Sequence, residues 1–482
     1  MTILRLVPWR LRRAPLAVAT LVVIGALLAA CSGGSAKPAA GGTAPSGAAN
    51  PAAASGSVAP GGDGAAGADA GASRAGWRAP TLLSVVPIQL PFTVSDPKFD
   101  AMPGARAIFG ENAGAGYEIE VPDSWNGDVV YFAHGFRGNA PELTVQAPPI
   151  REYLITHGYA WAASSYSANG YDPGAGARDT YALRDVFAQK VGTPKHSYIY
   201  GQSMGGHVTS FSLEQYPTAY DGALAECGVV SGHEVLDYLL SWAALSGYFS
   251  GQDLFSLTND AGKLINVLRN DVGQTLGPPN KLTDKGQAFA NVIENLTGGP
   301  RPFFREGFVV NYIVNFGLLF QAAAQPAITN AVAQNAATRY AIDDGRTVSS
   351  DQLNREVARI AADPKYRDVA THPEFADFTG KIKRPYLTIH GTGDLFVPIS
   401  LEQSYRRTVD AAGAGDLLVQ RAIRRAGHCT FSQDERISAF EDLVNWVEHG
   451  KKPAGEDLTA SLADAGRAFT QPLLPDDPGG LR

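Results

Sequence analysis

Three side chains, distant from one another in the sequence, have the types and surroundings needed to attack a carbonyl carbon. Ser203 stands at the centre of GQSMG (201–205), which matches the pattern G-x-S-x-G. A serine hydroxyl is a weak nucleophile near neutral pH unless a base takes its proton. His428, in RAGHCTF, is the candidate base, and Asp394, in GTGDLFVP, is the candidate carboxylate that orients it. Together they predict nucleophilic catalysis by Ser203.

The segments on either side of GQSMG predict how the serine is displayed. The strand-like stretch HSYIY (196–200) precedes it, and the helix-like stretch MGGHVTSFSLEQY (204–216) follows it. A strand, a sharp turn and a helix in this order present the serine at a helix N-terminus, where backbone amides and the helix dipole stabilise a developing anion. Small residues at 201 and 205 allow the sharp turn.

An oxyanion in such a site needs two backbone donors. The amide of Met204, directly after the nucleophile, is the first predicted donor. The amide of Phe136 is the second, because it follows the apolar strand in VVYFAHGFRG (129–138). His134 in the same stretch is expected to be structural rather than catalytic.

The elements that must position these residues alternate between strand-like and helix-like segments, which predicts an α/β fold with a mostly parallel sheet. The later strands are continuous apolar runs, as expected for strands covered on both faces. The candidate strands are 105–112, 116–122, 127–135, 158–166, 196–203, 221–230, 384–394 and 417–428. A final helix begins at the capping box of Ser432 and Glu435, and Gly450 is placed to end it.

Residues 232–375 interrupt this alternation and predict a helical cap inserted between the core segments 79–231 and 376–452. Most of the cap's aromatic side chains are expected to form its own core, and a few are expected to line a substrate cleft beneath it. These aromatics are Tyr238, Trp242, Tyr248, Phe249, Phe303, Phe304, Tyr312, Phe316 and Phe320. The tail, 453–482, is expected to be peripheral.

The N-terminus predicts export and a lipid anchor. Residues 1–30 combine a basic start with an uncharged apolar run, and the sequence LAAC, which ends at Cys31, resembles a bacterial lipobox. Cys31 is therefore the predicted lipidation site, and a plain signal peptide is the alternative. Residues 31–78 are rich in Ala, Gly and Pro and predict a disordered tether.

Charge limits the partners. The precursor carries −7, and removing the signal with its four arginines and no acids leaves −11. An acidic protein is a poor candidate for nucleic-acid binding. Membrane attachment must then depend on the lipid, and the expected location is extracytoplasmic, at the cell surface or in the periplasm.

The stretches HGF, GQSMGG, GTGDLFVP and GHC, in this order between residues 105 and 450, resemble the serine esterases and lipases of the α/β-hydrolase superfamily. The resemblance implies a mostly parallel sheet flanked by helices, with the nucleophile at Ser203, the acid at Asp394 and the base at His428. It implies acyl transfer to water through an acyl-enzyme, without a metal or organic cofactor. Glu226, after the preceding strand, is the less favoured alternative acid.

The two remaining cysteines, Cys227 and Cys429, are similar to a feature of feruloyl esterases and tannases. There a cysteine after the catalytic histidine forms a disulfide with a cysteine before the serine. Residue 202 is Gln in this chain, so the resemblance implies a Cys227–Cys429 disulfide instead. Two buried free thiols are the alternative.

The leading hypothesis is a serine hydrolase that cleaves small-molecule or polymeric carboxylic esters with an apolar or aromatic acyl group. The same three residues also serve peptidases and hydrolases of C–C bonds in diketones. A binding protein on an inactive hydrolase scaffold is the alternative of another class, and the presence of all three side chains argues against it. The sequence leaves the oligomeric state open.

Overall fold

The computed structural model describes residues 91–95, 97–319 and 329–471. The predicted signal, Cys31 and the whole predicted tether lie outside these residues, as do Phe320 and the end of the tail. Within the described residues, every helix is too short or too polar to cross a bilayer.

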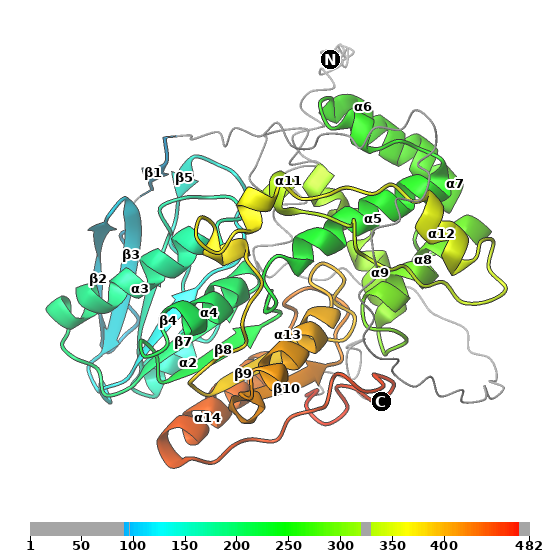
Figure 1. The fold of residues 1–482 in the computed structure, drawn as a ribbon. Helices are drawn as coiled ribbons and strands as arrows, with labels where there is room; N and C mark the ends of the chain where they lie inside the picture. Colours follow the sequence, from blue (N-terminus) through cyan, green and yellow to red (C-terminus); the bar gives the residue numbers. More distant parts are fainter. Residues whose placement is uncertain (1–90, 96, 320–328, 472–482) are drawn as a thin grey trace, which may run out of the picture.

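An eight-stranded sheet forms the centre of the molecule, in the order β10-β9-β8-β7-β4-β6-β3-β2 (Figure 1). The strands from β6 to β10 are parallel, whereas β2 and β3 form an antiparallel hairpin at one edge. The strands are β2 (Ala105–Asn112), β3 (Ala115–Pro122), β4 (Val129–Ala133), β6 (Ala160–Ser164), β7 (Ser197–Gln202), β8 (Gly222–Glu226), β9 (Tyr386–Gly391) and β10 (Leu418–Ile423). Two short strands, β1 (Thr93–Val94) and β5 (Glu142–Leu143), pair separately. The α/β-hydrolase fold expected from the resemblance is confirmed.

Helices cover both faces of the sheet, which explains the apolar runs in its strands. In β4, Val129 and Tyr131 pack under one layer of helices, and Val130 and Phe132 pack under the other. The first layer consists of α3 (Pro173–Lys190), α4 (Met204–Gln215) and α13 (Ser400–Ala411), and the second of α2 (Arg151–Thr156) and α14 (Gln433–His449). Figure 1 shows α3 and α4 in front of the sheet.

Helix α14 has the predicted ends. The Ser432 hydroxyl accepts from the Glu435 amide, and the Glu435 carboxylate accepts from the Ser432 amide. Gly450 terminates the helix in the left-handed conformation, with φ of 67°. The local sequence therefore determines both ends of this helix.

The described part of the segment between β8 and β9 consists of helices joined by loops and contains no strand. Most of its helices, green to yellow in Figure 1, gather on the side of the molecule away from β2 and β3, whereas η5 (Pro373–Phe375) contacts α3 and α4. They are α5 (Glu234–Ser250), η1 (Phe255–Leu257), α6 (Ala261–Val267), η2 (Leu268–Val272), α7 (Gly273–Leu276), α8 (Asp284–Leu296), α9 (Phe304–Asn311), η3 (Val314–Phe316), α11 (Thr329–Val332), α12 (Ser350–Glu356), η4 (Pro364–Arg367) and η5 (Pro373–Phe375). Most of its aromatics are buried in one cluster, in which Trp242 lies 5.1 Å from Phe289 and 5.4 Å from Phe308 between ring centroids.

The expectation of a peripheral tail is wrong for residues 453–471. Glu456 pairs with edge strand β10, because its amide donates to Gln420 O and its carboxylate accepts from the Ala422 amide. Leu458 and Leu462 are then buried against the core. The tail therefore covers the otherwise open edge of the sheet at β10. The acidic, Pro-containing composition of the tail did not indicate this contact.

Glu118 on β3 predicts a pH dependence of stability. Burial raises the pKa of its carboxyl group from the ordinary 4.5 to about 7. Between these two values the folded state binds more protons than the unfolded state, so stability falls as the pH rises through this window. We expect Glu118→Gln to remove this loss and to unfold at a higher temperature than the wild type at pH 8.

Thermal unfolding of both proteins at pH 4 and pH 8 measures the effect. Glu111→Gln, an exposed position on β2, is the matched control and should follow the wild type at both values. Equal shifts for the two variants would contradict the assignment.

Candidate active site

Ser203 occupies a strained turn between β7 and α4. Its φ of 57° and ψ of −118° lie outside the regions that side-chain-bearing residues favour. The turn is held by its backbone, since the Ser203 amide donates to Glu226 O at 3.1 Å and Ser203 O accepts from Gly206 N at 2.8 Å. A Cβ atom on Gly205 would lie 1.9 Å from Ala133 O, so only glycine lets α4 begin this close to β4.

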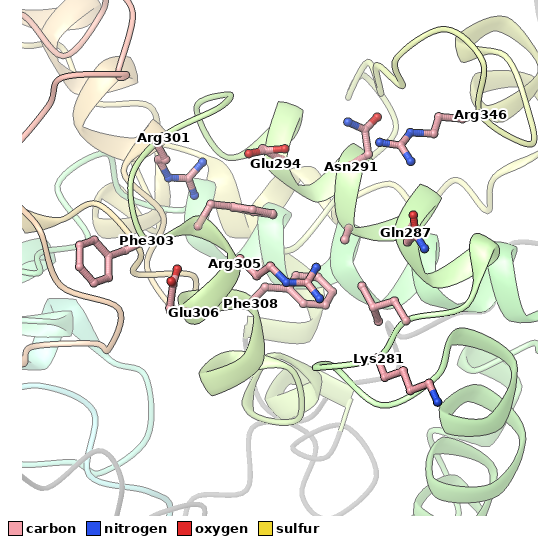
Figure 2. Close-up of a pocket in the computed structure, with 13 residues that line it drawn as sticks. Lys281, Gln287, Asn291, Glu294, Arg301, Phe303, Arg305, Glu306, Phe308 and Arg346 are labelled. Carbon is pink, nitrogen blue, oxygen red and sulfur yellow. The ribbon is translucent and has the colours of Figure 1, made fainter. Parts of the chain in front are cut away.

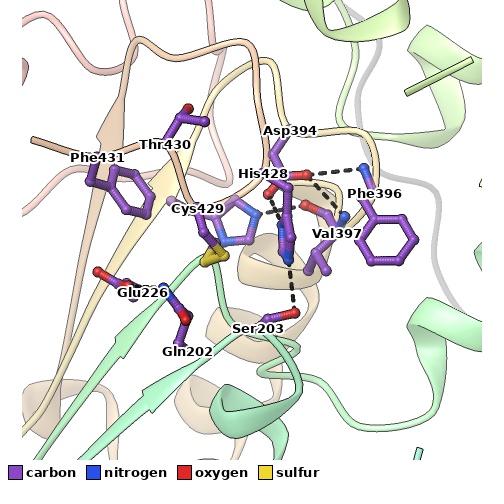
Figure 3. Close-up of a disulfide and its surroundings, with 12 residues drawn as sticks. Gln202, Ser203, Glu226, Asp394, Phe396, Val397, His428, Cys429, Thr430 and Phe431 are labelled. Carbon is purple, nitrogen blue, oxygen red and sulfur yellow. Dashed lines mark hydrogen bonds and ion pairs between the residues drawn. A yellow bond between two sulfur atoms is a disulfide. The ribbon is translucent and has the colours of Figure 1, made fainter. Parts of the chain in front are cut away.

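The structure brings the three predicted chemical residues into one hydrogen-bonded chain (Figure 3). Ser203 Oγ lies 2.8 Å from His428 Nε2, and His428 Nδ1 lies 2.6 Å from Asp394 Oδ2. Ser203 follows β7, Asp394 follows β9 and His428 follows β10, and these strands are parallel. Their carboxyl ends therefore share one edge of the sheet, which is where ligands bind in such folds.

The Asp394 carboxylate is fixed on both of its oxygens. Oδ1 accepts from the amides of Phe396 and Val397, each at 3.0 Å, and Oδ2 faces the imidazole. The Phe396 ring lies edge-on to the His428 ring with centroids 5.2 Å apart. The carboxylate is buried and the imidazole side chain is 11% exposed. A buried carboxylate in this position favours the Nδ1–H tautomer, which leaves Nε2 free to accept the serine proton.

Of the two predicted oxyanion donors, Met204 directly follows the serine and Phe136 directly follows Gly135, which lies close to the serine side chain. Met204 opens α4, and a Cβ atom on Gly135 would lie 3.5 Å from Ser203 Oγ. Burial lowers the pKa of His134 to about 4, so its ring is neutral and its Nδ1–H donates to Gly135 O at 2.7 Å. In a planar trans peptide the N–H points opposite to the C=O, so this bond turns the Phe136 amide away from the His134 ring. The roles of Met204 and Phe136 stay predictions.

Cys227 and Cys429 form a disulfide between the end of β8 and the loop that carries His428 (Figure 3). The pairing implied by the resemblance is therefore the one that the structure contains. Both cysteines adopt positive φ, 47° for Cys227 and 57° for Cys429. Cys227 directly follows β8, which ends at Glu226, whereas the predicted strand continued to residue 230.

A buried ion pair below the disulfide was not recognised in the sequence. Glu226 accepts from Arg436 Nε at 2.7 Å, from the Tyr200 hydroxyl at 2.8 Å and from Gln202 Nε2 at 2.5 Å. The same guanidinium donates to Cys429 O at 2.9 Å and thereby supports the histidine loop. Glu226 is thus committed to Arg436 and contributes no hydrogen bond to His428. Arg436 lies on a helix among residues that are mostly polar, and this local sequence did not indicate that its side chain is buried.

A cavity of about 490 Å³ lies within the cap, between α8 and α9 (Figure 2). Phe304 and Phe308 form apolar parts of its wall, and Arg301, Arg305 and Arg346 contribute cationic groups. Ser203, Asp394 and His428 do not line it. The cleft that was expected beneath the cap is therefore not this cavity, although two of the predicted aromatics, Phe303 and Phe304, border it.

Comparisons with known proteins give distant similarities. No family profile matches the chain. The o-phthalyl amidase of Xanthobacter agilis is 23% identical over 426 residues, which cover 74% of this chain and 91% of that protein. Among solved structures, an esterase from Aspergillus oryzae is 16% identical, with a TM-score of 0.40 over 72% of this chain and 80% of its own. Feruloyl esterase B from Aspergillus oryzae is 13% identical, with a TM-score of 0.37 over 72% and 82%.

Proposed function

We propose that this protein of the α/β-hydrolase fold is a serine hydrolase that cleaves carboxylic esters through an acyl-enzyme. The observation that carries the proposal is the hydrogen-bonded chain from Ser203 through His428 to Asp394, on a strained turn at the carboxyl edge of the sheet. A serine, a base and an orienting acid in this geometry are recognised by their roles, whatever the surrounding fold.

In the proposed reaction, Ser203 Oγ attacks the ester carbonyl while His428 Nε2 takes the serine proton. The oxyanion accepts hydrogen bonds from the Met204 and Phe136 amides. The tetrahedral intermediate collapses, the C–O bond to the alcohol breaks, and the alcohol leaves with the proton from His428. Water then repeats the sequence on the acyl-enzyme and releases the acid, and Asp394 stabilises the protonated imidazole in both halves.

Amide hydrolysis is the second candidate. The similarity to an o-phthalyl amidase favours it, and the same residues cleave an amide when His428 protonates the leaving amine. For either bond, the aromatic residues of the cap favour an apolar or aromatic acyl group, or a segment of a polyester. Peptides and diketones are the remaining substrate classes.

We also propose that the protein is a lipid-anchored, extracytoplasmic enzyme, with the anchor at Cys31. The lipobox-like sequence supports this location, and so does a disulfide next to the active site, because disulfides persist in oxidising compartments.

Labelling with a fluorophosphonate probe tests the proposed function. We expect one modified residue, Ser203, with loss of ester hydrolysis, and we expect Ser203→Ala to be neither labelled nor active. The labelled wild type should fractionate with membranes, whereas Cys31→Ser should not. An unlabelled wild type, or an active Ser203→Ala, would overturn the proposal. If Ser203 is labelled, the rates for paired ester and amide substrates separate the two candidate reactions.

A further inference from the structure

The cap contacts the turn that bears Asp394, and these contacts are built from buried polar groups. We propose that Arg301, Tyr238 and Asn315 are positioning residues, which hold this turn so that the carboxylate keeps its place beside His428. The inference rests on the proposed function, since it assigns the cap a role in the same reaction.

The inner side of the turn is bound to the core. The Thr392 amide donates to Ile423 O and the Gly393 amide donates to Arg425 O, each at 2.8 Å. These bonds attach the start of the turn to the end of β10. They leave the carbonyl of Thr392, and that of Leu395 beyond the acid, facing other partners.

Cap residues bind these carbonyls on both sides of the acid. Arg301 Nε donates to Thr392 O at 2.6 Å. The Tyr238 hydroxyl and Asn315 Nδ2 both donate to Leu395 O, at 2.6 and 2.7 Å. The turn is therefore held between β10 and the cap, with Asp394 in the middle of the clamped segment.

Arg301 is a buried cation with a defined set of partners. It is 8% exposed, and its remaining nitrogens donate to Gly299 O at 2.9 Å and Thr297 Oγ1 at 3.0 Å. Burial lowers the pKa of the guanidinium to about 10, so it stays charged at neutral pH. Figure 2 places it at one side of the cap cavity, near Glu294.

The Leu395 carbonyl determines the orientation of the Asn315 side-chain amide. Leu395 O can only accept, so the amide nitrogen must face it, and the same nitrogen donates to the Tyr238 hydroxyl at 3.0 Å. The side-chain oxygen of Asn315 is then buried without a hydrogen-bond partner among the described residues. A buried acceptor without a partner costs free energy. The orientation of Asn315 is nevertheless the one in which its nitrogen donates both to Leu395 O and to the Tyr238 hydroxyl.

The cap and the turn also meet backbone to backbone. A Cβ atom on Gly307 of α9 would lie 1.7 Å from Gly393 O. This contact leaves no space between the two segments. Because the Phe396 and Val397 amides that orient the carboxylate directly follow the clamped Leu395 carbonyl, release of that carbonyl would displace both donors.

Two matched pairs of variants separate positioning from general cap stability. Asn335 lies in the cap's own core and, like Asn315, donates to a tyrosine hydroxyl and a backbone carbonyl: Tyr340 OH at 3.0 Å and Ala358 O at 2.8 Å. Asn335 Oδ1 also accepts from the Ile360 amide at 2.7 Å. Asn335→Leu therefore removes at least as many buried bonds as Asn315→Leu, but only Asn315 touches the acid turn. Tyr238→Phe and Tyr340→Phe form the milder pair.

We expect Asn315→Leu to lower kcat for an activated ester about tenfold or more, with KM changed less than about twofold, since a small misplacement of a catalytic group is costly. Asn335→Leu should lower the melting temperature by at least as much and leave kcat within about twofold of wild type. Tyr238→Phe should lower kcat about threefold to tenfold, and Tyr340→Phe should not.

Hydrogen exchange of the Phe396 and Val397 amides tests the same clamp without any measurement of activity. We expect faster exchange in Asn315→Leu and Tyr238→Phe than in their controls. Equal exchange within each pair would overturn the inference, and so would equal losses of kcat. If the probe does not label Ser203 in the wild type but these amides exchange faster in Asn315→Leu and Tyr238→Phe, the proposed function is refuted and the clamp is still supported.

Discussion

Asp394→Asn is expected to lower kcat by about three to four orders of magnitude while the protein stays folded. The reason lies in the two amides, of Phe396 and Val397, that donate to Oδ1. They require an acceptor, so the asparagine oxygen must take that place and the NH₂ group must face His428 Nδ1. The imidazole then holds its proton on Nε2, where it cannot accept from Ser203.

Ester hydrolysis under saturating substrate measures this loss, and thermal unfolding verifies the fold. Asp128→Asn is the matched control, because Asp128 is also a buried aspartate bonded to a histidine, His196, at 3.1 Å. That pair lies at the opposite ends of strands β4 and β7 from the serine. Retained activity in Asp394→Asn, or an equal loss in Asp128→Asn, would show that Asp394 is not the acid.

Loss of the disulfide is expected to destabilise the protein by about 2–5 kcal/mol. The cross-link closes a loop with a sequence separation of 202 residues, which includes the whole cap. Restricting a loop of this length in the unfolded chain contributes up to about 5 kcal/mol in the chain-entropy account. Cys227→Ser with Cys429→Ser should therefore unfold at a lower denaturant concentration than the oxidised wild type.

The disulfide also adjoins the histidine loop, so activity should fall at temperatures well below the unfolding transition. Arg436 still binds Cys429 O in the variant, and we therefore expect a loss of about tenfold or less in kcat. Reduced wild type is the control and should match the double variant in both measurements. Oxidised and reduced proteins that unfold at the same denaturant concentration would contradict the stabilising role.

The sequence by itself determined the elements whose signals are local. Strand-like segments, the later ones continuous apolar runs, predicted the eight strands of the main sheet. The glycines around Ser203 predicted its turn, and the Ser432 capping box predicted the start of α14. The chain order of Ser203, Asp394 and His428 also indicated that they would meet, because each follows a strand and parallel strands share their carboxyl edge. Strands and helices show hydrophobic periods of 2 and 3.6 residues, and turns show characteristic residues, so a short stretch of sequence is enough to predict them.

Only the tertiary structure decided which side chains support that edge. Arg436 meets Glu226 across 210 residues, Tyr238 meets Leu395 across 157, and the tail at Glu456 covers β10. Each of these residues looks like an ordinary surface or core residue in its own segment. Their partners depend on how elements that are distant in the sequence pack together. A contact or hydrogen bond between such elements produces no periodic pattern in the local sequence.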